Sequence, residues 1–398
     1  KLFLPNLASG LPGVTVIELK DATRKVTIQR PDVKSPWVVV EKFGYPAADG
    51  VKPIFSSLLN MKILEEKTAR PDRFGAIGVA DLDKPGSTAK LLTLKDASGK
   101  EVASVLVGNS GDAGAPGARE GSLFVRRAGE NQSYQVSGGF AAETDPMSWV
   151  DKTVLQLERN RVKSVTVTRF DDPAFDASDP AKTNVLEAFR EGEKDLNFKV
   201  RNLPPGRELT YEGAADQPTN PLGYLAIDDV KPREQVDFSK MESAGPVKPA
   251  PGAKAPLART TARFACFDGL VLTVRVTKQE GKAWLALDAA FDEKEVVKPE
   301  EKKDEAKKDE AKKDAPKTDE PSKHKDPEAV KKEVEELNAK HGKWAYAVPD
   351  YSATQISARL EDLLKPPAPA KIGGPEAAGP QVPKPEDNIL IPDGPAPK

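Results

Sequence analysis

Short, β-branched segments constrain the fold more than any other feature, because they occur twice in the same order. In the first half, VTVIELK (residues 14–20), KVTIQR (25–30) and WVVVEK (37–42) have the composition of strands and are separated by turn-forming residues. The segment DGVKPIFSSLLNMKILEEK (49–67) follows, and the helical spacing of its apolar residues predicts an amphipathic helix. From VKSVTVTRF (162–170) the order repeats at an offset of about 150 residues, which is the size of a domain.

We therefore predict an α+β fold of two tandem related units, each a mainly antiparallel twisted sheet with packed helices. The first unit is expected over residues 1–158 and the second over residues 159–365. A short helix over residues 145–157 is expected to close the first unit, because Pro146 suits the first turn of a helix.

Three segments have compositions that cannot form a packed core. The charged run over residues 293–325 contains repeated KKDEA units and lies between two expected strands, KAWLALDAAF and WAYAVPDY. We predict that it is a disordered, solvated insertion in a hairpin rather than a partner-binding element. A Pro-rich loop is expected over residues 243–258 and a disordered Pro-rich tail over residues 366–398.

The charge and the scarce ligand residues exclude several classes of function. Lys plus Arg number 60 against 62 for Asp plus Glu, so no overall field attracts nucleic acid. The single cysteine, Cys266, and the two histidines, His324 and His341, cannot supply a cysteine-rich metal site. Acidic pairs are expected by chance among 62 acidic residues. We therefore assign no catalytic residue, no metal ligand and no cofactor.

Four aromatic residues are candidates for an exposed binding surface: Trp37, Tyr45, Trp344 and Tyr346. A row of exposed aromatic rings would suit a cell-envelope glycan or a peptide. The alternative, which we favour, is that most of the aromatic residues anchor the core, because they stand on alternating strands.

A second candidate surface lies where the two units are expected to meet. Arg159, Arg161 and Lys163 form a local positive patch in a nearly neutral chain, and a crevice between duplicated units is a common place for partners. The alternative is an ordinary solvated helix end, since basic residues suit a helix C-terminus.

The order of several motifs resembles a known bacterial family, domain of unknown function 4340. The motifs are WVVVEKFGYPAADGVKPIFSSLLNMKILEEK, LVGNSG, LFVRRAG, SYQVS and DPMSWVDKTV in the first unit. The segments ARFACFDGLVLTVRVTKQ and WAYAVPDYSATQISARLEDLL in the second unit are similar to the longer members. The resemblance implies an extracytoplasmic accessory protein with one N-terminal membrane helix, associated with gliding-type ABC transporters.

Three expectations of function follow, and the resemblance supports the first. The first is a non-catalytic, extracytoplasmic (periplasmic) module that docks on inner-membrane or envelope proteins such as ABC-transporter subunits. The second is a module that binds envelope glycan or peptide, and the third is a hydrolase with a carboxylate pair. The start of the sequence, KLFLP, is typical of a chain cut after a signal or membrane segment, so the anchor is expected outside this chain.

Overall fold

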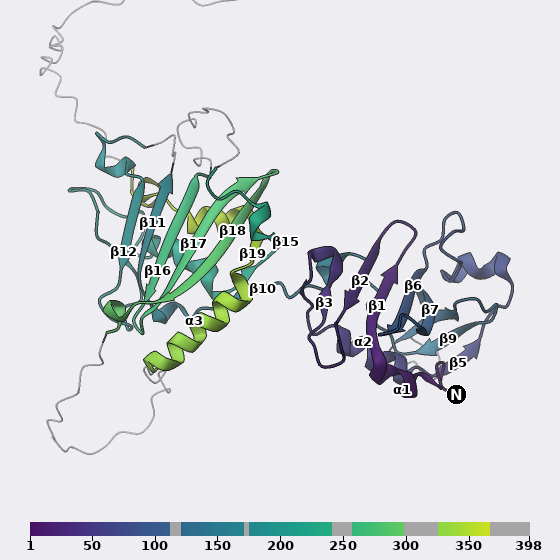
Figure 1. Cartoon of the computed structure of the whole chain (residues 1–398). Helices are drawn as coiled ribbons and strands as arrows, with labels where there is room; N and C mark the ends of the chain where they lie inside the picture. Colours follow the sequence, from purple (N-terminus) through teal and green to yellow (C-terminus); the bar gives the residue numbers. More distant parts are fainter. Residues whose placement is uncertain (112–120, 171–174, 241–256, 298–324, 367–398) are drawn as a thin grey trace, which may run out of the picture.

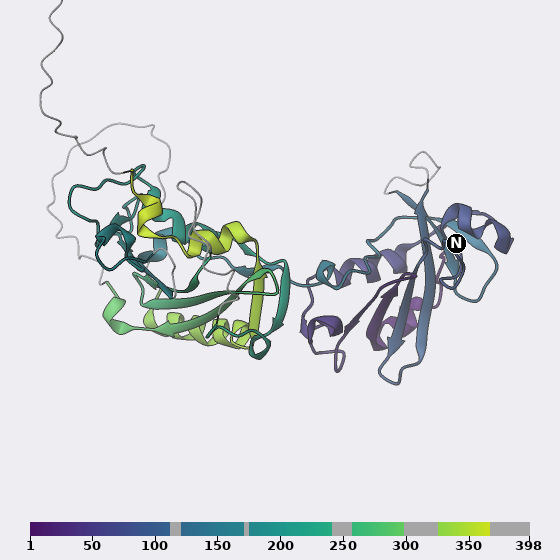
Figure 2. The same ribbon diagram turned by 90° about the horizontal axis from the view of Figure 1, so that it is seen from above.

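The computed structural model describes residues 1–111, 121–170, 175–240, 257–297 and 325–366. Within these ranges most strands belong to two large sheets, in which every pairing is antiparallel. Figure 1 shows the sheets as two lobes, and Figure 2 shows the same separation from above. The predicted α+β class is confirmed.

The first sheet has the strand order β4-β3-β2-β1-β6-β7-β8-β9-β5. Alternating apolar residues of these strands point to one face, where helix α2 (Val51–Asn60) adds Val51, Ile54 and Leu58 at helical spacing. The strands are β1 (Val14–Lys20), β2 (Lys25–Gln29), β3 (Val38–Val39), β4 (Tyr45–Pro46), β5 (Ile63–Glu66), β6 (Lys90–Asp96), β7 (Glu101–Ser110), β8 (Ser122–Arg127) and β9 (Ser133–Ser137). The short helices are α1 (Leu7–Gly10), η1 (Leu11–Gly13), η2 (Val40–Lys42) and η3 (Pro71–Ile77).

The second sheet has the order β13-β12-β11-β16-β17-β18-β19-β15. Its strands are β11 (Val162–Phe170), β12 (Val185–Phe189), β13 (Lys199–Val200), β15 (Asp229–Pro232), β16 (Arg259–Cys266), β17 (Leu270–Gln279), β18 (Lys282–Phe291) and β19 (Trp344–Val348). Helices α4 (Asp350–Ile356) and α5 (Leu360–Leu363) add Ala353, Ile356 and Leu360 to its core. The other helices near this sheet are η6 (Pro180–Lys182), η7 (Ala214–Gly223), η8 (Arg233–Gln235), η9 (Glu293–Glu295) and α3 (Pro327–His341).

The two sheets have the same strand order, as the sequence predicted. The edge strand β4 has no counterpart in the second sheet. Every other strand of the first sheet has one at the same place in the order, so that β1 corresponds to β11, β6 to β16 and β5 to β15. Strands β1 and β11 also share an irregularity. The register of β1 with β6 shifts between Val14 and Val16, and the register of β11 with β16 shifts between Val162 and Ser164. The tandem relation therefore extends to the local geometry of the strands.

A matching arginine reinforces this relation. Arg30 follows β2 and donates two hydrogen bonds to the carbonyl of Val14, the first residue of β1 (3.1 and 2.6 Å). Arg190 follows β12 and donates from Nε to the carbonyl of Val162, the first residue of β11 (3.0 Å). Each guanidinium also lies over an aromatic ring further along the chain, at 4.4 Å from the centroid of Trp37 and 4.8 Å from that of Phe198.

The charged run interrupts the hairpin of β18 and β19, as predicted. The two strands pair from Ala283 to Leu285 on the β18 side, and α3 stands between them in sequence. Beyond that pairing, the side-chain amide of Asn338 on α3 bonds both the N–H (2.9 Å) and the carbonyl (2.8 Å) of Ala289. Helix α3 therefore provides partners for the backbone hydrogen-bonding groups of Ala289, at a point of β18 that β19 does not reach.

The predicted start of the insertion is wrong by several residues. Asp292 caps η9, and Glu295 forms ion pairs with Lys163 (2.5 Å) and Arg263 (3.0 Å), so residues 293–297 pack on the second unit. Most of the insertion, the Pro-rich loop and the tail lies outside the described residues.

One helix prediction is correct only in its first part, and another is wrong. The segment 49–67 is helical only to Asn60 and then forms β5, because Ile63 and Glu65 pair with β9. Residues 145–157 form a single 3-10 turn, η4 (Pro146–Ser148), and then β10 (Thr153–Leu155). The β-branched Thr153 and Val154 favour the extended backbone, which pairs with β14 (Leu225–Ala226) of the second unit.

Candidate functional site

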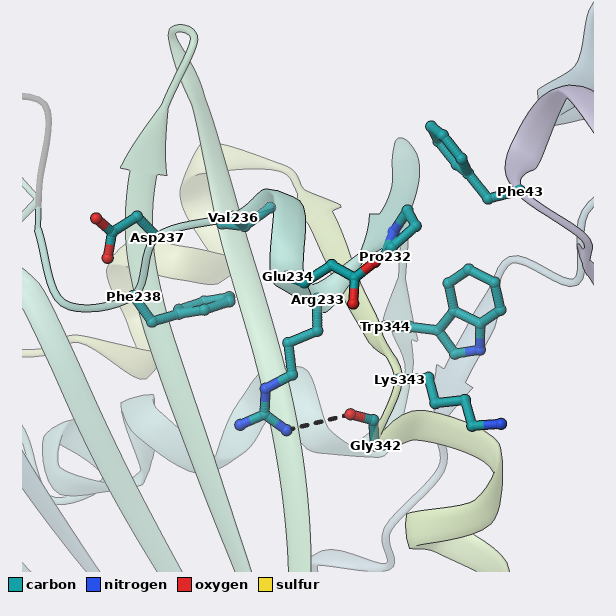
Figure 3. Close-up of a pocket in the computed structure, with 10 residues that line it drawn as sticks. All are labelled: Phe43, Pro232, Arg233, Glu234, Val236, Asp237, Phe238, Gly342, Lys343 and Trp344. Atoms are coloured by element: carbon teal, nitrogen blue, oxygen red, sulfur yellow. Dashed lines mark hydrogen bonds between the residues drawn. The ribbon is translucent and has the colours of Figure 1, made fainter.

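An open groove of about 1170 Å³ lies where the two lobes meet. Its lining residues come from the β3–β4 hairpin, from the end of β15 with the segment after it, and from the turn between α3 and β19 (Figure 3). They are Phe43, Pro232, Arg233, Glu234, Val236, Asp237, Phe238, Gly342, Lys343 and Trp344. We call this feature the junction groove.

Phe43 is the contribution of the first unit to the junction groove. It ends η2 at the tip of the β3–β4 hairpin, and its side chain is 50% exposed. Its backbone lies in the left-handed region (φ 57°), which β-carbon sterics disfavour for every residue except glycine. The hairpin requires this conformation, because the N–H groups of Phe43 and Gly44 both fold back to bond the carbonyls of Val40 and Val39 (each 3.0 Å). A bulky apolar side chain is therefore held in solvent at a position that favours glycine.

Trp344 forms the facing apolar surface. One part of its ring is packed against Tyr45, at 5.0 Å between centroids and nearly perpendicular, and the rest borders the groove. Its indole N–H makes no hydrogen bond to any residue that the structure describes, unlike the indole groups of Trp149 and Trp284. The groove thus contains an aromatic ring with an unused donor.

The charged residues of the groove differ in how far they are neutralised. Arg233 donates to both carboxylate oxygens of Asp288 (2.6 and 2.8 Å), and these bonds raise the pKa of its guanidinium. Asp237 accepts hydrogen bonds from the backbone and the hydroxyl of Ser239. Glu234 and Lys343 are exposed and form no ion pair within the described ranges, so they are the free charges of the groove.

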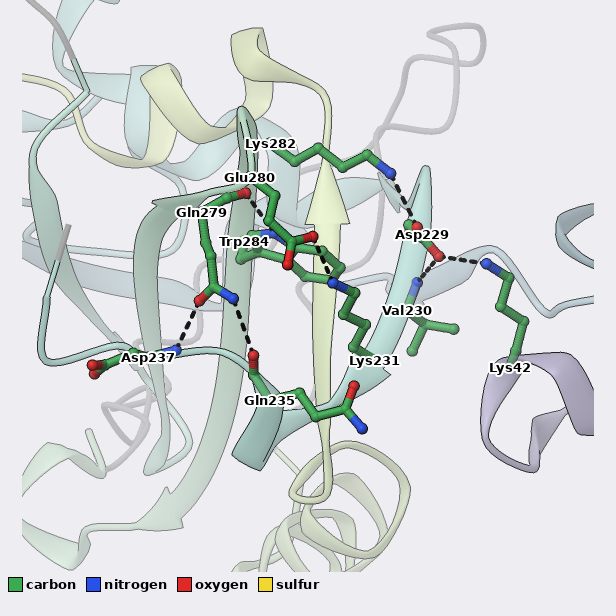
Figure 4. A network of polar contacts seen from close by, with 10 residues as sticks. All are labelled: Lys42, Asp229, Val230, Lys231, Gln235, Asp237, Gln279, Glu280, Lys282 and Trp284. Carbon is green, nitrogen blue, oxygen red and sulfur yellow. Dashed lines mark hydrogen bonds and ion pairs between the residues drawn. The ribbon is translucent and has the colours of Figure 1, made fainter. Parts of the chain in front are cut away.

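Asp229 connects the two units from the start of β15, the strand whose last residue, Pro232, lines the groove. Its carboxylate accepts hydrogen bonds from Lys42 of the first unit (2.7 Å) and from Lys282 of β18 (3.0 Å), as Figure 4 shows. Burial opposes ionisation, but the two lysines outweigh it and hold the pKa of Asp229 below its usual value. Lys42 precedes Phe43, so this ion pair also fixes the hairpin that carries the exposed ring.

A buried aromatic cluster lies beneath Trp344. Tyr45 of the first unit is 1% exposed and belongs to the core of the second unit, where its ring meets Tyr346 at 6.1 Å. The Tyr346 hydroxyl is 2.8 Å from Nδ1 of His341. Burial raises the pKa of Tyr45 to about 12 and lowers that of His341 to about 4, so both side chains are neutral near pH 7.

The structure corrects the prediction of four exposed aromatic residues. Tyr45 and Tyr346 are buried because they join the two units, which agrees with the alternative that aromatic residues anchor the core. Trp37 is half-buried between Arg30 and Phe55, at the edge of the first core. Trp344 alone of the four lines the groove.

The predicted positive patch is not made of free charges. Arg161 is bound by Asp268 (2.8 Å) and Glu333 (3.0 Å), and Lys163 is bound by Glu295. Arg159 donates to Asp216 and to the carbonyl of Leu196. These acids lie far away in sequence and are brought to the basic side chains only by the fold. Partner binding at the patch stays a prediction, and the junction groove lies elsewhere.

Sequence reasoning missed Phe43, Glu234 and Lys343. The only local signal was the dipeptide Phe43-Gly44 after a short strand, which indicates a tight turn but not its neighbours. The described residues contain no group of three or more His, Cys, Asp or Glu side chains suited to a metal ion. They also include no helix long and apolar enough to cross a membrane.

Comparison with known protein families gives a match over most of the first unit and part of the groove. A family model described as Domain of unknown function (DUF4340) matches residues 37–242, just over half of the 398-residue chain. The matched range includes Phe43 and the groove residues from Pro232 to Phe238. No curated protein and no solved structure matches the chain.

Proposed function

Because the chain belongs to the DUF4340 family, we propose that it is a non-catalytic accessory module of the bacterial envelope that docks on a protein partner through the junction groove. The family resemblance supports a location of the protein on the outer side of the cytoplasmic membrane. It also supports a membrane complex of the ABC-transporter type as the partner.

The observation that carries the proposal is the exposed side chain of Phe43. A phenylalanine at a left-handed position is expected to destabilise the fold relative to glycine by about 1–2 kcal/mol. Residues that combine backbone strain with exposure are concentrated at binding sites. Here the strained residue faces a half-buried tryptophan and two free charges, which are the elements of a protein-binding surface.

A second candidate function is binding of an envelope glycan. The observation in its favour is that Phe43 and Trp344 both border the groove, since aromatic faces pack against the apolar faces of sugars. Glycan binding also needs several polar groups around the rings. Binding of a soluble oligosaccharide to the groove would favour this function over docking on a protein.

Affinity purification tests the docking proposal. The tagged protein, expressed in its native bacterium with its natural N-terminal region, is expected to retain a membrane-transport subunit. Changing Phe43→Ser and Lys343→Glu together is expected to remove that subunit. The matched control is Tyr351→Ser, which changes an aromatic residue that is 68% exposed on α4 and does not line the groove. Equal recovery of the same subunit with both variants would contradict a docking role for the groove.

A fusion experiment tests the proposed location. Alkaline phosphatase is joined after Pro366 of the protein expressed with its natural N-terminal region. The enzyme is active only when it is exported, so cells that express the fusion are expected to show phosphatase activity. An inactive fusion that is present at normal abundance would place the module in the cytoplasm.

A further inference from the structure

We propose that the occupant of the junction groove is an extended, proline-containing peptide segment of the partner, recognised in a polyproline II conformation and carrying a basic residue. This inference rests on the proposed docking function and specifies its chemistry.

The sheet edge beside the groove is unsuited to adding a strand. Strand β15 ends the second sheet, and an incoming strand would need free N–H donors along it. The N–H of Val230 already donates to the carboxylate of Asp229 (2.8 Å), and Pro232 has no N–H. Lys42 and Lys282 occupy the same carboxylate and keep it in place. A peptide in the groove is therefore recognised through side chains and not through a β-ladder.

The groove suits a polyproline II helix instead. Such a helix has no internal hydrogen bonds, so its carbonyl groups accept bonds from the binding protein. The unused indole N–H of Trp344 supplies such a donor, while Phe43, Pro232 and Phe238 supply apolar surfaces for proline rings. Proline-rich segments bind grooves of this kind with a small loss of conformational entropy, because they are already extended.

The free charges indicate what flanks the proline residues. Arg233 and Asp237 are already engaged, so Glu234 and Lys343 are left to interact with the occupant. Glu234 favours a Lys or Arg on the peptide, and Lys343 favours an acidic side chain or a carbonyl group. The charge on the peptide therefore sets its direction in the groove.

The β3–β4 hairpin is preorganised for binding. The ion pair between Lys42 and Asp229 and the two backbone hydrogen bonds at Phe43 and Gly44 hold the Phe43 ring over the groove. Little ordering of the protein is then needed on binding, which favours affinity for a short segment.

The test uses fluorescence anisotropy with the purified chain of residues 1–398. The probes are a library of labelled peptides with a Pro-x-x-Pro core and one Lys or Glu at each flanking position, the same peptides with alanine for proline, and a chito-oligosaccharide as competitor. We expect binding by some Lys-containing proline peptides and about tenfold weaker binding of the alanine peptides. Phe43→Ser is expected to weaken binding by a similar factor, and Tyr351→Ser is expected to have no effect.

Charge reversal supplies the internal control. Glu234→Lys is expected to weaken the Lys-containing peptides and to strengthen their Glu-containing counterparts, with an unchanged melting temperature. Failure of the whole library, equal affinity for the alanine peptides, or displacement by the oligosaccharide would overturn the inference. If the library fails while affinity purification still recovers a groove-dependent partner, the docking function stands and only its proline chemistry is wrong.

Discussion

Two non-glycine residues of the described chain have a positive φ, and they differ in their context. Glu280 lies in the two-residue turn between β17 and β18, followed by Gly281, where such a conformation matches the twist of the strands. Phe43 lies in a five-residue connection and presents a large apolar ring to solvent. The turn explains the backbone of both residues, and the exposed ring of Phe43 is the feature that the proposed docking role would use.

This difference gives the first prediction. Phe43→Gly is expected to raise the free energy of unfolding by about 1 kcal/mol, because glycine adopts the left-handed conformation without a β-carbon clash. The same change is expected to abolish partner binding. Chemical denaturation and the anisotropy assay measure the two effects. A destabilised Phe43→Gly protein would show instead that the ring is structural.

The second prediction concerns pH and His341. Its folded pKa of about 4 lies below the ordinary value of 6.5, so the unfolded chain binds the proton more readily. The stabilisation is complete above pH 6.5 and is lost as the pH falls toward 4. At 1.36 kcal/mol per pKa unit this loss amounts to about 3 kcal/mol.

His341→Gln removes the proton-binding group and retains a polar partner for Tyr346. Urea denaturation of both proteins from pH 7 to pH 4 is expected to show a steeper loss of stability for the natural chain. Curves that run parallel over this range would mean that His341 does not stay neutral in the folded state.

Single residues were the hardest to predict from sequence. The alternation of β18 and β19 correctly favours burial of most aromatic residues, yet it does not show that Tyr45 fills the core of the other unit. The basic side chains near residue 160 looked like a free positive patch in the sequence. The partners of Arg161, which are Asp268 and Glu333, lie more than a hundred residues away. Contacts of this range depend on the packing of the two units.

At the level of elements, Arg30 and Arg190 occupy matching places after the second strand of each unit. Both hold the beginning of the first strand by bonding its backbone carbonyl. Arg190 also donates to the carbonyls of Arg159 and Asn160, and it is more deeply buried than Arg30. The two arginines therefore close the same corner of each sheet, with more bonds in the second unit.

The third prediction follows from this pairing. Arg190→Met leaves several buried carbonyl groups without a donor and is expected to lower the free energy of unfolding by about 3 kcal/mol. Arg30→Met is expected to lower it by about 1–2 kcal/mol, because its site is more open. Arg201→Met, an exposed change over Phe189, is the control and should stay within about 0.5 kcal/mol. A loss for Arg30→Met larger than that for Arg190→Met would contradict the assignment.

Most strands and their order could be predicted from sequence, because β-branched alternation is a local signal and duplication repeats it. Helices were less predictable. Residues 63–66 continue the apolar spacing of α2 but pair with β9, and residues 153–155 extend because a strand of the second unit is available. In both segments tertiary pairing overrides the local periodicity.

At the scale of the whole molecule, the charged run is an addition to a hairpin whose ends are well anchored. Glu295 holds the first end through Lys163 and Arg263, and Lys325 pairs with Glu333 at the other end (3.0 Å). The interval between these anchors is expected to contribute little to folding, since closing a longer loop costs only about 0.6 kcal/mol per doubling of its length.

The fourth prediction compares two deletions. Replacing residues 298–324 with a short Gly-Ser linker is expected to leave the melting temperature within about 3 °C of the natural chain. Replacing residues 293–324 also removes both ion pairs of Glu295 and is expected to lower the melting temperature further. Equal and large losses for the two deletions would show that the charged run itself packs on the second unit.

The two units are joined by Tyr45 in the second core and by the ion pair between Lys42 and Asp229, and both contacts converge on the hairpin that carries Phe43. The central claim is that this hairpin and the facing residues form the docking site. Site-specific photocrosslinking in living cells tests it most directly, with benzoylphenylalanine placed at position 43 and, as a control, at position 351. The account predicts a single crosslinked membrane-complex subunit from position 43 and none from position 351. A folded, correctly located protein that gives no crosslink at position 43, or the same crosslinks from both positions, would contradict it.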